Sequence, residues 1–399
     1  MTPSTSLNIV DNDSVYLDGY INMNNSNDNW TWPYSDYPAI YVISMYHLYP
    51  IIIIGRVLHI VWYFTGIVGN VLSLRIWILP RMKRFNISAL YLVGITVSDI
   101  SYQKLHLLYY LKYFWGVASI GVAGVCQTWN MLYLVPQYTS QLFVLAFSTE
   151  RYIAIFHPFK GERFSRYHRA PKIVAVLTVF SLVISTPQAY FWEVDSNGFC
   201  ELRPGTDFMD QYSAWSVASE TVLFLFIPFI TLALNIMVLR ETYQSIEKRK
   251  ALATDIMSKN KLHRNIGQNC RPSTVTLLCI SFSRILTQLP VSLTYAIQNW
   301  FQYGAEMPLE QMKHDPVWER FIHYWGLRVV IDTLGSSHHA LSIFVFYYST
   351  KQFRTELHSI ISTVKSVILR RSEMPNAISL NVNSELRFTE STHRTNSWS

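Results

Sequence analysis

The sequence predicts an all-α membrane protein, a seven-transmembrane helix bundle with an amphipathic juxtamembrane helix. Half of its 399 residues are hydrophobic and only 15% are charged, whereas soluble domains carry roughly 25% charged residues. A hydrocarbon core of about 30 Å is crossed by about 20 mostly apolar residues per helix. Seven such runs follow one another along the chain, near 52–79, 87–113, 123–156, 172–191, 213–239, 273–298 and 322–348.

Loop charge predicts the orientation of these spans, because Lys and Arg are retained on the cytosolic side. Eighteen basic and 4 acidic residues lie in the segments 75–84, 151–172 and 240–272. Only 3 basic but 14 acidic residues lie in the segments 1–46, 191–212 and 303–320. We therefore expect a multi-pass plasma-membrane protein with its N-terminus outside and its C-terminus in the cytoplasm. The net charge of +7 sums a basic inner face and an acidic outer face, and does not indicate nucleic-acid binding.

The same charge map divides the chain into four regions. Residues 1–46 lack the basic start and apolar stretch of a signal peptide and are rich in Asn, Asp and Ser, so we expect a disordered extracellular tail. Residues 47–349 form the bundle, and residues 350–371 have the apolar and basic faces of a helix lying on the membrane surface. Residues 372–399 are interpreted as a flexible cytoplasmic tail.

Residue types on the outer side predict two modifications. The tail holds glycosylation sequons at Asn12, Asn24 and Asn29. Cys126, at the outer end of the third run, and Cys200, in the loop after the fourth, share the oxidising compartment and are expected to form a disulfide. The alternative is that the cysteines stay unpaired.

Polar residues within the apolar runs are candidates for contacts inside the bundle, because such groups are costly in hydrocarbon. Asn70, Asp99 and Ser140 stand in the first three runs at depths where they can meet. A carboxylate flanked by an amide and a hydroxyl suits either a small cation with its water or a purely structural hydrogen-bond cluster. Residue types alone leave both readings open.

Several of these residues, in their order and spacing, resemble one receptor family. The chain has Gly69-Asn70, Ser98-Asp99, Cys126 followed twenty-five residues later by Arg151 in "ERY", Cys200, and prolines in or beside spans four to six, Pro187, Pro228 and Pro290. Residues 45–360 are thereby similar to the rhodopsin-like (class A) family of G-protein-coupled receptors.

This resemblance implies a role for each matching residue. Arg151, with Glu150 restraining it at rest and Tyr152 beside it, would face a heterotrimeric G protein. Asn70, Asp99 and Ser140 match the family's sodium pocket, so a possible allosteric sodium ion would be the one bound cofactor. Cys126 and Cys200 match the family's disulfide. Phe353 would begin the amphipathic helix that lies on the membrane surface in contact with lipid.

The chain also departs from the family pattern. Leu177 stands where span four usually has Trp, and Gln288 takes the place of the switch tryptophan two residues before Pro290. A Gln before Leu-Pro resembles the invertebrate neuropeptide receptors of the FMRFamide-type group. Span seven has Ser342-Ile343 in place of Asn-Pro-x-x-Tyr, so signal transmission is expected to use altered packing. Arg284 is an unexpected charge to which the sequence assigns no role.

The predicted ligand is an extracellular peptide. Tyr133 stands where amine receptors of the family carry an aspartate, and span seven lacks the lysine of the opsins. The acidic outer face favours a cationic or amidated peptide. Arg328 and Asp332, four residues apart, either pair with each other or face the ligand. The pocket candidates are Tyr109, Tyr133, Gln137, Glu220, Gln288, Tyr295, Arg328 and Asp332.

Two other functional classes are compatible with seven spans. A chemosensory receptor for a small molecule is the first alternative, and a transporter or channel is the second, although the chain lacks the internal repeats of many transporters. An enzyme is not expected, because the sequence has no Gly-rich phosphate loop and no His/Cys cluster with metal-ligand spacing. His338 and His339 are adjacent and are expected to point to different helix faces.

Overall fold

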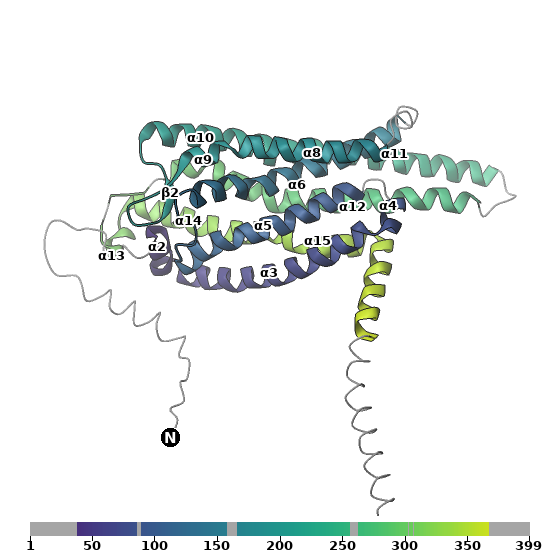
Figure 1. Ribbon diagram of the computed structural model, residues 1–399. Helices are drawn as coiled ribbons and strands as arrows, with labels where there is room; N and C mark the ends of the chain where they lie inside the picture. The colour runs from purple at the N-terminus through teal and green to yellow at the C-terminus, as the bar shows by residue number, and fades with distance from the viewer. Residues whose placement is uncertain are drawn as a thin grey trace, which may run out of the picture.

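The computed structural model describes residues 38–85, 89–157, 166–255, 262–301, 303–305 and 307–366, most of them helical (Figure 1). Seven helical spans coincide with the seven predicted runs. In chain order they are α3 (Tyr49–Ile78); α5 (Ala89–Trp115); α6 (Val125–Phe156); α8 (Arg166–Ser185) with α9 (Pro187–Phe191); α10 (Thr206–Glu220) with η1 (Thr221–Phe226) and α11 (Ile227–Asp255); α12 (Leu262–Ala296); and α14 (Pro316–Gly335) with α15 (Ser337–Ser349). Short helices connect them: α2 (Ala39–His47), α4 (Pro80–Phe85), η2 (Gln298–Trp300) and α13 (Leu309–Met312).

By length and composition, four spans of the described chain are apolar enough to cross a membrane, namely Tyr49–Ile78, Arg169–Phe191, Asp210–Ser245 and Pro316–Ser349. The helices α5 and α6 are more polar. They pack against each other and against several other spans, and they bury polar side chains such as Asp99, Gln103 and Gln141. Polar residues are tolerated in spanning helices where they face the bundle interior.

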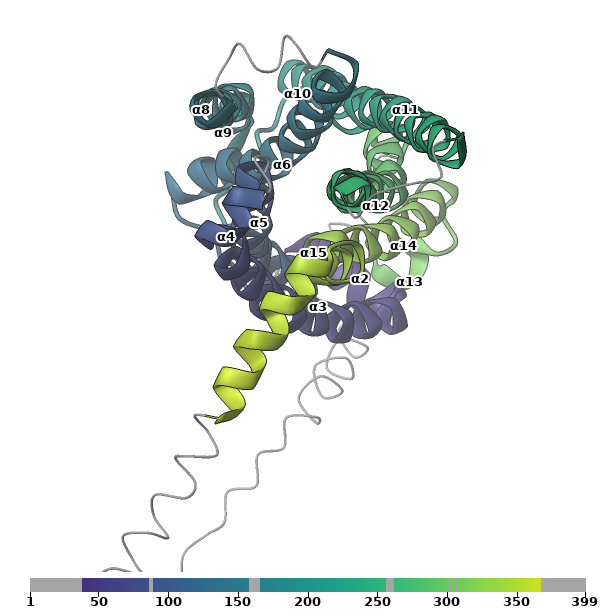
Figure 2. The same ribbon diagram turned by 90° about the vertical axis from the view of Figure 1, so that its right-hand side faces the viewer.

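Seen end-on, the spans enclose the middle of the bundle (Figure 2). The helix α6 packs against α5, α8, α11 and α12, and α3 closes the circuit against α5, α14 and α15. The helix α8 lies at the periphery and contacts chiefly α6.

Besides the break at Thr186 in span four, spans five and seven are interrupted. Pro228 lacks an N–H, so the turn before it widens into the π-helix η1, in which the Ile227 N–H donates to the Val222 carbonyl. Span seven breaks at Ser336, between α14 and α15, where Gly335 packs closely against Val291 of α12. Both breaks fall beside residues of the candidate site described below.

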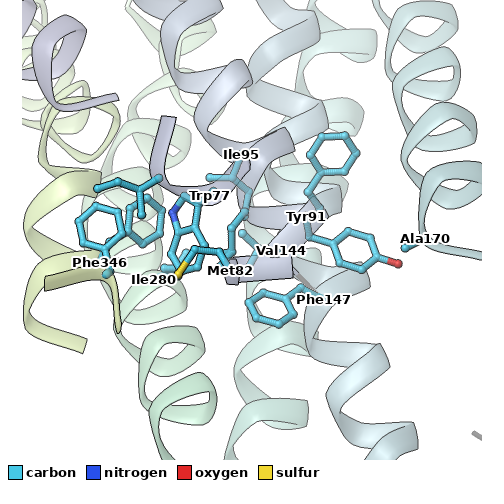
Figure 3. Close-up of a cluster of buried hydrophobic side chains, with 14 of the residues drawn as sticks. Trp77, Met82, Tyr91, Ile95, Val144, Phe147, Ala170, Ile280 and Phe346 are labelled. Atoms are coloured by element: carbon cyan, nitrogen blue, oxygen red, sulfur yellow. The ribbon is translucent and has the colours of Figure 1, made fainter. Parts of the chain in front are cut away.

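One core cluster fills the end of the bundle near α4 (Figure 3). Trp77 is fully buried, with its ring 5.4 Å from Phe346 and 5.6 Å from Phe353. Phe353 belongs to a helix over 351–366 that follows a break at Thr350. Its apolar side is buried at Phe353 and Leu357, and Ile361 is exposed. We call this the basic end of the bundle, since its loops carry the excess of Lys and Arg.

The opposite end carries a hairpin of β1 (Trp192–Val194) and β2 (Cys200–Leu202), paired antiparallel. We call this the hairpin end. The predicted disulfide is confirmed, with Cα atoms of Cys126 and Cys200 5.5 Å apart. Lys112 provides a second attachment, because its buried ammonium donates to the Cys200 carbonyl at 2.5 Å and to Glu201 Oε1 at 2.8 Å. The hairpin is therefore held over the bundle by a covalent bond and an ion pair.

One predicted boundary changes, one small element was not predicted, and several predictions lie outside the described residues. Residues 39–47 are not part of a disordered tail, because α2 packs on α3, α5 and α14 and buries Ile43. The hairpin is a small β element that an all-α prediction omitted. The surface helix is described as far as 366, and residues 367–371, the tail 372–399 and the sequons at Asn12, Asn24 and Asn29 lie outside the described residues.

Trp77→Ala should lower the free energy of unfolding by about 3–5 kcal/mol, because it leaves a cavity between Phe346 and Phe353. Thermal unfolding of the purified full chain in detergent measures the effect. The matched control is Phe64→Ala on the same helix, whose side chain is 73% exposed on the outer surface. Equal destabilisation by both substitutions would contradict this role for Trp77.

Lys112→Met should loosen the hairpin while the disulfide stays intact, since the Cys200 carbonyl and Glu201 both lose their donor. Hydrogen exchange of amides 192–202 should become faster than in the unaltered protein. Lys104→Met, at an exposed position of the same helix, serves as the control. Unchanged exchange in Lys112→Met would show that the disulfide alone holds the hairpin.

Candidate functional site

A cavity of about 1070 Å³ opens at the hairpin end, between α5, α6, α10, α12 and α14. All eight predicted pocket residues line it: Tyr109, Tyr133, Gln137, Glu220, Gln288, Tyr295, Arg328 and Asp332. Ligand pockets of drug-sized molecules measure about 300–1,000 Å³. The cavity is at the upper limit of that range and has room for several amino-acid side chains.

Stacked aromatic rings form one wall of this cavity. The ring of Tyr133 lies 4.9 Å from Trp129 and 6.0 Å from Tyr109, nearly parallel to both. Tyr102 continues the stack 5.8 Å from Tyr133. Such rings offer large rigid apolar faces and hydroxyl groups at their edges. An aromatic wall therefore replaces the carboxylate that an amine ligand would require at position 133.

Arg328 and Asp332 pair with each other across one helix turn, with Nε 3.6 Å from Oδ2. The guanidinium also lies 4.0 Å from the centre of the Tyr295 ring and donates to Gln298 at 3.2 Å. The pairing that the sequence allowed is present, and both residues also line the cavity. The charges of both residues are balanced before any ligand enters.

Glu220 differs from Asp332 in this respect. It is the last residue of α10, immediately before η1, and its side chain faces the cavity. In the described part of the chain, no ion pair is formed by Glu220. A carboxylate in a low-dielectric cavity attracts a cation strongly. Glu220 is therefore the acidic group best placed to bind a positively charged ligand.

Asp99 lies below the cavity and is fully buried. Its Oδ1 accepts hydrogen bonds from Arg284 Nη2 at 3.3 Å and His339 Nδ1 at 2.7 Å, and its Oδ2 accepts one from Ser342 at 2.7 Å. A carboxylate can only accept, which fixes the hydrogen on Nδ1 of His339. Arg284, to which the sequence assigned no role, is thus the partner of Asp99.

Among the described hydrogen bonds, none joins Asp99 to Asn70 or Ser140, the other two residues of the predicted sodium pocket. Asn70 donates from Nδ2 to the His339 carbonyl at 2.7 Å. The Asn70 Oδ1 and Ser140 Oγ atoms are buried without a hydrogen-bond partner.

The two adjacent histidines connect this cluster with the cavity. His338 lines the cavity and lies 3.1 Å from Thr287 Oγ1, whereas His339 contacts Asp99. They have separate partners, and their ring centres lie 3.9 Å apart. Both side chains are buried.

At the basic end, the predicted activation residues lie on the last two turns of α6. Glu150 is buried and faces Arg169 of α8 at 3.5 Å. The guanidinium of Arg151 lies 5.4 Å from the Phe147 ring centre, and Tyr152 stacks on Phe156 at 4.5 Å. The restraint of Arg151 by Glu150 stays a prediction.

Sequence reasoning missed Lys112, Trp129 and the pairing of Arg284. The sequence did hold a signal for the pairing of Arg284, because one buried cation and one buried carboxylate in otherwise apolar spans are expected to neutralise each other. Within the described residues, no group of three or more His, Cys, Asp and Glu side chains has the arrangement of a metal site.

Comparison with known proteins adds a family to this geometry. The family model described as "7 transmembrane receptor (rhodopsin family)" matches residues 69–324, well over half of the chain. Lysophosphatidic acid receptor 6 of Gallus gallus is 22% identical over 64% of this chain and 85% of its own length.

Two peptide-named receptors match over shorter regions. The pyrokinin-1 receptor of Drosophila melanogaster is 30% identical over 35% of this chain and 32% of its own. Nematocin receptor 1 of Caenorhabditis elegans is 26% identical over 44% and 47%. The family match, the seven spans and the Cys126–Cys200 disulfide agree. The chain is a multi-pass plasma-membrane protein and not an enzyme, and it belongs to the rhodopsin family of G-protein-coupled receptors.

Proposed function

We propose that this receptor binds an extracellular neuropeptide, cationic or amidated and bearing Arg, and that it signals through a heterotrimeric G protein. The observation that carries the proposal is Glu220, a carboxylate without an ion-pair partner in the described chain, facing a cavity of about 1070 Å³. In the proposed orientation the N-terminus and the hairpin end are extracellular.

Charge around the cavity mouth supports a cationic ligand. The segments 1–46, 191–212 and 303–320, which the sequence predicts to be extracellular, hold 14 acidic and 3 basic residues. Of the acidic groups there, Glu193 pairs with Arg203 at 3.3 Å and Glu201 pairs with Lys112, and both carboxylates remain about half exposed. Such a field attracts cations over several ångströms and is weakened by salt.

The relatives support a peptide without identifying it. Two of them are named for pyrokinin and nematocin, and Gln288 before Leu-Pro resembles the FMRFamide-type receptors. The lysophosphatidic acid receptor suggests a lipid instead. Among the described residues, however, the cations lining the cavity are Lys112 and Arg328, and each is already paired with a carboxylate. A phosphate headgroup would have to displace one of these carboxylates.

A peptide library should therefore activate the receptor in cells that carry a promiscuous G protein, and small odorants and lysophospholipids should not. With an active peptide, Glu220→Gln should lower potency at least tenfold, because truncating one partner of a buried charge pair costs about 2–5 kcal/mol. Glu310→Gln, at an exposed position of α13 outside the cavity, is the matched control.

Asp332→Asn completes this test, since Asp332 is the second predicted carboxylate that lines the cavity. Unchanged potency in both Glu220→Gln and Asp332→Asn, at normal surface expression, would refute an ion pair between the ligand and either of these two residues. Activation by odorants alone would favour the chemosensory alternative. Ion flux in vesicles free of G protein would favour a transporter or channel.

Arg151→Ala should retain ligand binding and lose G-protein activation, because Arg151 lies on the last turns of α6 at the basic end, far along the span from the cavity. Nucleotide exchange on an added G protein and ligand binding to the same membranes measure the two properties separately. Lys172→Ala, an exposed basic residue of α8 near the same end, should leave both unchanged. Full signalling by Arg151→Ala at normal surface expression would remove this role.

A further inference from the structure

We propose that Arg284 is a built-in cation for Asp99 and occupies the place of a sodium ion in this receptor. The two side chains are almost fully buried, with 0% of Asp99 and 3% of Arg284 exposed. They come from α5 and α12, 185 residues apart in the chain, and their charged atoms lie 3.3 Å from each other.

The hydrogen-bond inventory of Asp99 leaves little room for a metal ligand. Oδ1 is shared by Arg284 and His339, and Oδ2 is held by Ser342. A carboxylate has about four lone-pair sites, so these three donors leave about one for a sodium ion unless a donor is displaced. The residues present therefore do not fit the sodium ion that the family resemblance implies.

Charge balance leads to the same conclusion. A buried carboxylate is stable when one positive charge compensates it, and the guanidinium supplies that charge with directed hydrogen bonds. A sodium ion added next to Arg284 would place two cations against one anion in a region of low dielectric, where their repulsion is strong. Sodium would bind only if Arg284 moved away.

The guanidinium of Arg284 is covalently attached to α12, so its ion pair with Asp99 also links α12 to α5. Arg284 connects α12 to α5, and His339 and Ser342 connect α15 to the same carboxylate. His338, whose ring centre lies 3.9 Å from that of His339, lines the cavity. A displacement of α12 relative to α5 consequently has to stretch or break the Arg284–Asp99 pair.

The proposal predicts that the receptor is insensitive to sodium and becomes sensitive when Arg284 is removed. In Arg284→Leu, Asp99 loses its cation, and the unpartnered oxygens of Asn70 and Ser140 remain buried in neighbouring spans. Thermal unfolding of the purified full chain is followed in sodium chloride and in choline chloride at equal ionic strength. No ligand is required, so the result is independent of the peptide proposal.

The unaltered receptor should melt at the same temperature in both salts. Arg284→Leu should melt at a lower temperature in choline, and sodium should raise that temperature in a saturable manner, as expected for an ion that binds only the folded state. The double variant Asp99→Asn/Arg284→Leu should again be insensitive. Potassium chloride is then substituted for sodium chloride. An ion site that selects by size should respond to sodium alone, whereas general screening of charges by salt should raise the melting temperature equally in both salts.

Two results would overturn the proposal. One is saturable stabilisation of the unaltered receptor by sodium, which would mean that the ion binds beside Arg284. The other is an Arg284→Leu variant as stable as the unaltered receptor and insensitive to sodium, which would mean that Asp99 needs no cation. If Arg284→Leu does not fold, Arg284→Gln takes its place with the same expected sodium dependence, and the unaltered receptor still decides the first point.

Discussion

The ion pair between Asp99 and Arg284 is the interaction on which the middle of the bundle depends. Both side chains are buried, and an unpaired charge in a membrane-spanning helix is among the costliest groups a protein can contain. Each residue therefore requires the other, and three spans are drawn together as a consequence. The cavity above and the core around Trp77 below are separated by this polar layer.

The positions of the spans were predictable because each requires a run of about 20 apolar residues, and such runs leave a plain signal. The disulfide was predictable because two cysteines shared one compartment. The candidate pocket was also well anticipated, since aromatic and polar residues in the outer halves of neighbouring spans converge when the spans form a bundle. These features depend on local composition and on topology.

Other features depend on contacts between distant segments and left no local pattern. The partner of Arg284 is 185 residues away. The helix α2 is short and borders an Asn- and Asp-rich tail, and it is stabilised by packing on other spans, including a hydrogen bond from Trp325 Nε1 to Ser44 Oγ at 2.8 Å. The rings of His338 and His339 lie 3.9 Å apart, although the two side chains have different hydrogen-bond partners. Helical periodicity alone places adjacent side chains apart.

The π-helix η1 separates the two halves of span five, and the two halves make different contacts. Glu220 on one side faces the cavity, whereas Asn235 on the other donates to Ser281 of α12 at 2.6 Å. One additional residue turns a helix by about 100°. The wide turn therefore sets the direction in which Glu220 points around the helix axis, independently of the contact between α11 and α12. Related sequences that gain or lose one residue between 221 and 226 would present a different side chain to the ligand and would keep the contact between α11 and α12. Ligand recognition can therefore diversify by a rotation of α10 alone.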